Sequence, residues 1–275
     1  MRSRHMHEVV EGVEIVRWNP RIRIGSMKRR IGPRINNFGD LLGPEIVRRI
    51  VARDAIHGSP ASDVRVLAVG SILHLAHTDD IVWGGGVNGK IPDAQYRFER
   101  IDVRAVRGPR TREYLERRGC EVPAVYGDPA MLLPQLMPQL VEWSHQKVRR
   151  DLIVPNMHDY PTWRSGHRSA QILNPRAPLM KCLKTIAQSE RVIGSSLHGL
   201  IVAESLGIPA TPVSSGVESP FKYLDHFEGT GRHDVPIHSS LAEGLATGIR
   251  PVEFALDTDA LLAAFPSDRW TAARP

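Results

Sequence analysis

The segment with the clearest chemical potential runs from Arg191 to Pro209. It reads as a buried strand, Arg191–Gly194, that ends in two serines and passes directly into a helix with His198 in its first turn. The free N–H groups of a helix N-terminus bind anions, and Ser195 or Ser196 can cap the helix and donate to an oxyanion. His198 can act there as a base or a neutral donor. In the alternative, structural interpretation, a serine only caps the helix and the histidine packs against the next loop.

A glycine turn is the second candidate. The predicted strand Asp80–Trp83 continues into Gly84, Gly85 and Gly86. Such glycines let a backbone approach a ligand closely and present N–H groups to phosphate or carboxylate. The spacing and the following helix of the dinucleotide fingerprint are missing. Taken alone, the segment is therefore interpreted first as a tight turn.

Arginines follow a third strand. Arg107 leaves the end of the predicted strand Asp102–Val106, and Arg110 falls in the first turn of the next helix, where the dipole disfavours a cation unless an anion is near. Arginine suits bidentate capture of carboxylate or phosphate. We therefore expect Arg107 to bind an anionic substrate, with a solvated basic face as the alternative.

Four more polar residues have both a functional and a structural interpretation. Asn37 and Asp40 precede the first strong helix, where capping is the first interpretation of Asp40. His158 follows the predicted strand Leu152–Val154, on the carboxyl side of the sheet. Lys222 lies between aromatic neighbours, so it either reaches a ligand or covers the surface.

Short β-branched runs alternate with helical patterns along the chain, which is typical of α/β units with a mainly parallel sheet. Besides the strands named above, we predict strands at Val64–Val69, Ala124–Tyr126 and Thr211–Val213. The predicted helices are Pro44–Ala52, with Pro44 in the first turn, Pro109–Arg118, Leu179–Gln188 and Leu197–Leu206. Gly119 and Gly207 suit left-handed C-terminal caps, and Asp128 reads first as the cap of a turn.

The alternation breaks around residues 134–150, which we interpret as a linker between an N-terminal Rossmann-like domain, 1–140, and a C-terminal one, 141–275, with a helical tail. A length of 275 residues fits one large domain or two modest ones. Two α/β halves leave a cleft between them, where such architectures bind ligands.

Composition limits the partners. The chain has 41% hydrophobic and 24% charged residues, as ordinary globular proteins do, and 36 Lys and Arg against 30 Asp and Glu give a net charge of +6. This charge suits nucleic acid, an acidic membrane face or an anionic small molecule. Cys120 and Cys182 are not at metal-ligand spacing, so we predict reduced thiols and no metal site. Without a long apolar run or a secretory signal, the predicted location is the cytoplasm.

Five motifs occur in a fixed order: Asn37-Phe38-Gly39-Asp40, Trp83-Gly84-Gly85-Gly86, Val106-Arg107-Gly108-Pro109-Arg110-Thr111, Tyr126-Gly127-Asp128-Pro129-Ala130 and Ser195-Ser196-Leu197-His198-Gly199. In this the chain resembles the polysaccharide pyruvyl transferase family, and most closely the bacterial exopolysaccharide ketal pyruvyl transferases of the succinoglycan and xanthan type. The resemblance spans residues 34–228 and includes Phe221-Lys222-Tyr223.

The resemblance implies a GT-B-like α/β fold, with two Rossmann-like domains with mainly parallel sheets facing a cleft. It also implies a reaction without a cofactor, in which phosphoenolpyruvate gives its three-carbon unit to two hydroxyls of one sugar and phosphate leaves. His198 and Arg107 are then catalytic: Arg107 holds the donor, and His198 takes the hydroxyl proton or protonates the methylene carbon. The implied substrate-binding residues are Asn37, Asp40, Gly85, Gly86, Arg110, His158, Ser195, Ser196, Leu197 and Lys222.

The chain departs from the family where some relatives carry an arginine close before the histidine, because Ser195 and Ser196 stand there. Arg110, Lys222 or His158 are the candidates to replace that cation. The acceptor is a saccharide of an exopolysaccharide or its lipid-linked precursor, and family analogy alone suggests a place at the inner face of the cytoplasmic membrane. The oligomeric state is not predicted.

Two other functions compete. A GT-B nucleotide-sugar glycosyltransferase is suggested by His198-Gly199 and the helix after it, although the Arg107 motif argues against it. A non-catalytic protein that binds anions or nucleic acid is suggested by the net charge. Because the basic runs lack interleaved aromatic residues and match no standard DNA-binding motif, no nucleic-acid partner is predicted.

Overall fold

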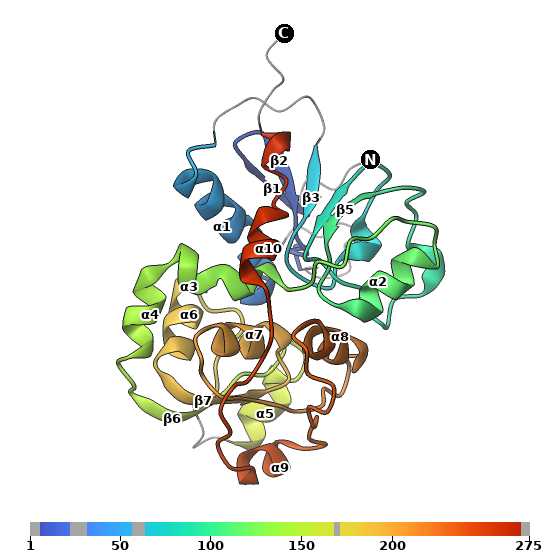
Figure 1. The fold of residues 1–275 in the computed structure, drawn as a ribbon. Coiled ribbons are helices and arrows are strands. Elements are labelled where there is room, and N and C mark those ends of the chain that lie inside the picture. Colours follow the sequence, from blue (N-terminus) through green and yellow to red (C-terminus); the bar gives the residue numbers. More distant parts are fainter. Residues whose placement is uncertain (1–5, 23–31, 57–63, 168–170, 271–275) are drawn as a thin grey trace.

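Two mainly parallel sheets organise the molecule, as the computed structural model of residues 6–22, 32–56, 64–167 and 171–270 shows (Figure 1). The first sheet has the order β1 (His7–Val10), β2 (Val13–Val16), β3 (Arg65–Leu67), β4 (Ile81–Trp83) and β5 (Asp102–Ala105). Only the β1–β2 pair is antiparallel. The second sheet has three parallel strands, β6 (Arg149–Ile153), β7 (Ser189–Gly194) and β8 (Ala210–Pro212). The predicted α/β class with mainly parallel sheets is confirmed.

The β1–β2 hairpin is an element that the sequence analysis did not predict. Its turn places Glu11 and Gly12 at φ values of 44° and 85°, a left-handed pair that a two-residue hairpin loop requires. Val10, Val13 and Ile15 are buried in the core. Conversely, the predicted strand Ala124–Tyr126 is reduced to a single parallel bridge between Val106 and Tyr126.

Helix α1 (Phe38–Arg53) begins six residues before the predicted start, so Pro44 lies inside the helix and not in its first turn. The reason is burial at a spacing of four residues, since Phe38, Leu42, Ile46 and Ile50 are all fully buried on one side. Their packing outweighs the backbone hydrogen bond that an interior proline removes. The earlier start brings Asn37 and Asp40 to the N-terminus of the helix.

Residues 134–150, expected to be a linker, are largely folded. The 3-10 helix η3 (Pro129–Leu132) leads into α3 (Leu133–Leu136) and α4 (Pro138–Ser144). The side chains of Leu136, Met137 and Leu140 are buried in the main core, and this apolar spacing is what holds the segment against the rest of the molecule.

The remaining helices follow the strands of each half. They are α2 (Pro109–Glu116), α5 (Tyr160–Gly166), α6 (Leu179–Ala187), α7 (Leu197–Ser205), α8 (Phe221–Gly229), α9 (Leu241–Ala246) and α10 (Thr258–Ala263), with 3-10 turns η1 (Leu73–Leu75), η2 (Asp93–Gln95) and η4 (Ser267–Arg269). Gly119 and Gly207 adopt the predicted left-handed conformation after α2 and α7. Within the described ranges, no helix has the length and apolar character that crossing a membrane requires.

One continuous apolar core joins the two sheets. Alternate residues of the strands enter it, such as Ile81 and Trp83 of β4 and Val192 of β7, together with α1, η3 and α7. The last helix returns to the first half (Figure 1). There the Trp83 indole donates to the Leu261 carbonyl at 2.8 Å. The division near residue 140 stays a prediction, and the tail beyond α9 contacts the first half.

Candidate active site

A cavity of about 320 Å³ lies between the two sheets. Its walls come from the start of α1 and from the segments that follow β2, β3, β4, β6, β7 and β8. The carboxyl ends of parallel strands are where open α/β sheets place their ligand sites. The lining residues are Trp18, Asn37, Asp40, Ser71, Ile72, His74, Asn88, Lys90, Ile91, Asn156, Met157, His158, Ser196, Leu197, His198, Glu218 and Lys222.

The β7–α7 turn supplies three of the predicted residues to this cavity. Ser196 is the N-cap of α7, and its Oγ accepts from the Gly199 amide at 3.2 Å. Leu197 and His198 follow it in the cavity wall. Ser195 does not line the cavity. It is fully buried and donates to Asp159 Oδ2 at 2.6 Å, so it fixes the neighbouring loop.

His198 reaches the cavity from the first turn of α7, and its side chain is 13% exposed. Its Nε2 lies 3.6 Å from Oδ2 of Asp128, a fully buried carboxylate that sequence analysis had assigned only to a turn. The other side of the ring lies over Gly39 of α1. A Cβ atom at that glycine would come within 2.4 Å of the imidazole Nδ1.

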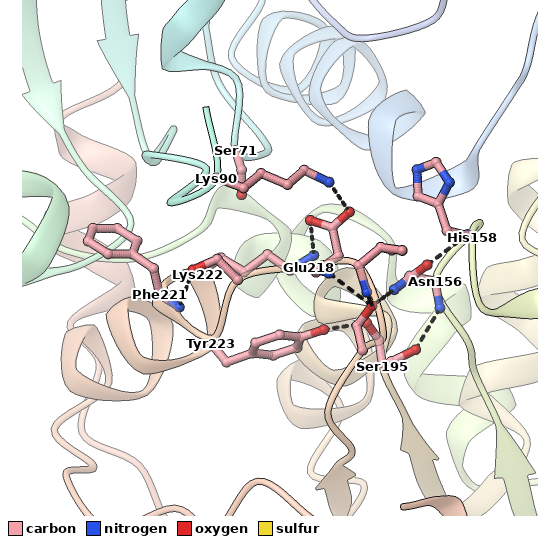
Figure 2. A network of polar contacts seen from close by, with 12 residues as sticks. Ser71, Lys90, Asn156, His158, Ser195, Glu218, Phe221, Lys222 and Tyr223 are labelled. Atoms are coloured by element: carbon pink, nitrogen blue, oxygen red, sulfur yellow. Dashed lines mark hydrogen bonds and ion pairs between the residues drawn. The ribbon is translucent and has the colours of Figure 1, made fainter. Parts of the chain in front are cut away.

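Lys222, one of the cations predicted to bind substrate, lines the cavity. It is 9% exposed and forms an ion pair with Glu218 at 3.2 Å, and Lys90 from the first half approaches the same carboxylate (Figure 2). Burial lowers the pKa of Lys222, an effect that Glu218 opposes. Burial alone would raise the pKa of Glu218, but the two lysines bring it below its ordinary value. We call these three residues the lysine cluster.

Asp40 lies beside His198 and the lysine cluster. Its carboxylate accepts from Nδ2 of Asn37 at 2.7 Å. Burial raises the pKa of Asp40 to about 6, against the lowering effect of Asn37, His198 and Lys222. Asp40 is in the first turn of α1 and is not its N-cap, which is Asn37. The structure therefore offers a carboxyl that can exchange protons near neutral pH.

His158 also lines the cavity, from the loop after β6 (Figure 2). The loop is held by Asn156, whose Oδ1 accepts from the His158 amide at 2.7 Å and whose Nδ2 donates to Asp159 at 2.7 Å. Because Asp159 in turn accepts from Ser195, the two predicted segments around His158 and Ser195 are joined by one buried network.

Arg107 has a different place from the expected one. Its side chain is fully buried and donates to Asp225 Oδ2 at 2.9 Å, to Ser71 Oγ at 2.7 Å and to the Val87 carbonyl at 2.8 Å. Asp225 is fully buried as well and also accepts from the amide and hydroxyl of Thr111. The structure therefore places Arg107 in a buried ion pair behind the cavity wall, and its expected contact with an anionic substrate stays a prediction.

Gly85, Gly86 and Arg110 do not line the cavity either. The Gly86 amide donates to the Gly70 carbonyl at 2.9 Å, and a Cβ atom at Gly86 would lie 2.4 Å from the Arg107 guanidinium carbon. The glycine turn thus makes room for the Arg107 side chain. Arg110 forms a bidentate pair with Glu228, at 2.9 and 2.7 Å.

The sequence analysis missed several lining residues. Lys90 and Asn88 follow the glycine turn, Asn156 follows β6, and Ser71 and His74 follow β3. Their position after strand ends was the available signal, but their residue types are common in loops. In the described part of the chain, no group of three or more His, Cys, Asp or Glu residues is arranged to hold a metal ion.

The fold and the cavity define a class, an α/β protein with a polar cavity at the carboxyl ends of the strands of two sheets. The chain belongs to the polysaccharide pyruvyl transferase family, whose model matches residues 37–216. It is 27% identical over 205 residues to the succinoglycan biosynthesis protein ExoV of Rhizobium meliloti (strain 1021), a match that covers 67% of this chain and 60% of ExoV. The chain thus spans less than two thirds of that relative. No solved structure shows significant similarity to it.

Proposed function

We propose that this protein transfers the pyruvyl unit of phosphoenolpyruvate to two hydroxyls of one sugar in an exopolysaccharide or its lipid-linked precursor. One observation carries the proposal: the family match, residues 37–216, contains most of the residues that line the cavity, from Asn37 to His198. Glu218 and Lys222 follow within a few residues of its end.

The donor is a small molecule with a phosphate and a carboxylate. In this proposal Lys90 and Lys222 bind one of these groups, which takes the place of the Glu218 carboxylate between them. Ser196 and the amides at the start of α7 bind the other, since a helix N-terminus favours negative charge. This arrangement replaces the anion-binding role that the sequence analysis gave to Arg107 and Arg110.

The reaction balances with two hydroxyls and one enol phosphate. The methylene carbon of the donor gains a proton, C2 forms two C–O bonds to the sugar, and the C2–O bond to phosphate breaks. The two hydroxyl protons are released, so one proton is returned to the methylene carbon and one leaves with phosphate or solvent. His198 carries one of these transfers, and Asp40, with a pKa of about 6, is a second proton carrier in the same cavity.

The proposal extends to the architecture and the setting. The two sheets and the cavity between them are consistent with a GT-B-like arrangement of two Rossmann-like halves, 1–140 and 141–275. No cofactor enters the proposed reaction. A cytoplasmic protein that works at the inner face of the membrane, on a lipid-linked saccharide and without nucleic acid, follows from the same proposal.

The test supplies phosphoenolpyruvate with galactosyl-, mannosyl- or glucosyl-terminated acceptors and follows phosphate and product mass. The expected product has the mass of the acceptor plus one pyruvyl ketal, formed with one phosphate. We expect His198→Ala to lose about 10²-fold or more of this activity, since a positioned proton transfer contributes roughly 10²–10⁴-fold. His145→Ala, in the turn after α4 and outside the cavity, is the matched control.

Three results would contradict the proposal. The first is full activity in His198→Ala, which removes the mechanism. The second is release of nucleotide from a sugar nucleotide with no reaction of phosphoenolpyruvate, which is the behaviour of a glycosyltransferase. Salt-sensitive binding to random DNA without phosphate release would instead indicate a non-catalytic protein.

A further inference from the structure

Two buried polar atoms face each other behind the cavity. His198 Nε2 and Asp128 Oδ2 lie 3.6 Å apart, and neither has a hydrogen-bond partner among the residues that the structure describes. Asp128 is fully buried, and its other oxygen, Oδ1, accepts from the Ala130 amide at 2.9 Å to cap η3. The cap therefore uses only half of the carboxylate and leaves Oδ2 directed at the imidazole.

A buried carboxylate oxygen that accepts no hydrogen bond destabilises the folded state. The nearest group that can donate a hydrogen bond to it is therefore favoured in its donor form. A neutral imidazole has one N–H and one lone pair, and the group beside each nitrogen selects the tautomer. A carboxylate accepts and does not donate. Next to Asp128, therefore, the favoured form of His198 carries its proton on Nε2.

The opposite side of the ring faces a different environment. Nδ1 lies over Gly39 in the first turn of α1, so close that any side chain at that position would collide with it. Asn37 and Asp40 of the same turn line the cavity. The positive end of α1 disfavours a further N–H dipole directed at it and favours a lone pair. Both neighbours thus select the same tautomer.

We propose that Asp128 is a positioning residue that keeps the proton of neutral His198 on Nε2, so that the Nδ1 lone pair is the base that takes the proton of the attacking sugar hydroxyl. The inference rests on the proposed pyruvyl transfer. The O–H bond breaks as a bond to Nδ1 forms, and the oxygen pair attacks C2 of the donor as the π pair of its double bond takes a proton on the methylene carbon from the second carrier, Asp40. The Asp128 carboxylate stabilises the resulting imidazolium. Hydrogen bonds of catalytic groups often shorten only when substrate binds, which is compatible with the 3.6 Å separation.

The test is the tautomer of His198, read by long-range ¹H–¹⁵N correlation on the full chain with ¹⁵N-labelled histidine at alkaline pH. The chain has 12 histidines, and the signals of His198 are those missing from His198→Gln. We expect a protonated Nε2 in the parent and a protonated Nδ1 in Asp128→Asn, because the amide of asparagine donates to Nε2 while its oxygen keeps the η3 cap. Asp257→Asn is the matched control, since Asp257 Oδ1 also caps a helix, α10, by accepting from the Ala260 amide at 2.7 Å, and no contact among the described residues joins it to a histidine.

A parent protein with the proton on Nδ1, or an unchanged tautomer in Asp128→Asn, overturns the inference. If Asp128→Asn does not fold, Asp128→Ser retains a cap acceptor without the second oxygen, and averaged nitrogen shifts are then expected in place of the parent pattern. In turnover, Asp128→Asn should lower kcat about 10²-fold with little change in KM for phosphoenolpyruvate. Because the NMR measurement needs no substrate, its result is independent of whether the proposed reaction is right.

Discussion

The two halves of the molecule end a buried parallel strand in a similar way and use it differently. In the first half, β5 is followed by Arg107 and then α2, and in the second half β7 is followed by Ser196 and His198 in α7. Arg107 is fully buried against Asp225, whereas His198 reaches the cavity. A polar residue after a strand therefore indicates where the cavity lies. It does not indicate whether the side chain reaches the cavity or is buried behind its wall.

The largest expected effect is a loss of stability that shows whether Arg107 has a structural role or binds substrate. Arg107→Ala should lower the free energy of unfolding by about 3–5 kcal/mol, because it leaves the buried Asp225 carboxylate without its cation. Arg110→Ala removes a half-exposed pair with Glu228 and should cost less than about 1 kcal/mol. Urea unfolding measures both. A stable Arg107→Ala protein that had lost only its affinity for phosphoenolpyruvate would return Arg107 to the substrate site.

The second prediction tests the close contact that Gly39 of α1 makes with His198. Gly39→Ala should reduce phosphate release about 10²-fold, because the new methyl group displaces the His198 ring and misplacement by about 1 Å has an effect of that size. Gly43→Ala is the matched control in the same helix, since a Cβ atom there makes an ordinary contact of 3.4 Å with Val69. Equal activity of the two variants would mean that the ring position is unimportant.

A third prediction concerns the lysine cluster. Lys222→Gln should raise KM for phosphoenolpyruvate about 10-fold, since a charge-assisted hydrogen bond contributes about 1.5–3 kcal/mol. Glu218→Gln should lower KM, because the donor then no longer competes with a carboxylate. Lys181→Gln, exposed on α6, serves as the control. The assignment fails if both cluster variants move KM in the same direction.

The smallest expected effect is a pH dependence of stability. Burial raises the pKa of Asp40 to about 6, so the stability that its neutral form provides is complete below about pH 4 and is lost as the pH rises through 6. Asp40→Asn should therefore match the parent near pH 4 and exceed it by about 1–2 kcal/mol near pH 7.5.

The control for this prediction has the opposite sign. The Arg53 side chain lowers the pKa of Asp54, so its carboxylate stabilises the protein above its unfolded pKa. Asp54→Asn should thus be the less stable variant near neutral pH. Unfolding curves at both pH values compare the two variants with the parent. An Asp40→Asn protein that is no more stable than the parent at pH 7.5 would refute the raised pKa of Asp40.

The fold class could be predicted from the sequence because the patterns that indicate it are local. Buried strands such as β4 and β7 are runs of apolar residues between turn residues, and glycines such as Gly119 and Gly207 have the backbone conformation that a helix end requires. The start of α1 was predicted too late, since propensity rules place proline first, while packing of Phe38 and Leu42 extends the helix before it.

The sequence allowed us to predict which residues gather at the candidate site, but not which contacts they make there. Asn37, Asp40, His158 and Lys222 were expected, and they meet in one cavity. Arg107 was expected there too, but its partner Asp225 is 118 residues away in the sequence, and no local pattern reveals that pair. Lys90 was missed for the same reason, because only the fold brings it to Glu218.

The return of the last helix to the first half has a consequence for synthesis on the ribosome. Trp83 donates to Leu261, 178 residues later, and the Trp270 indole donates to the Val10 carbonyl across 260 residues. Trp270 and Phe265 complete the apolar core around Trp83. The N-terminal half leaves the ribosome first, but the Trp83 side chain stays partly exposed until the segment around residues 261–270 has been synthesised. Chaperone binding to the nascent chain should therefore end only after that segment has been made.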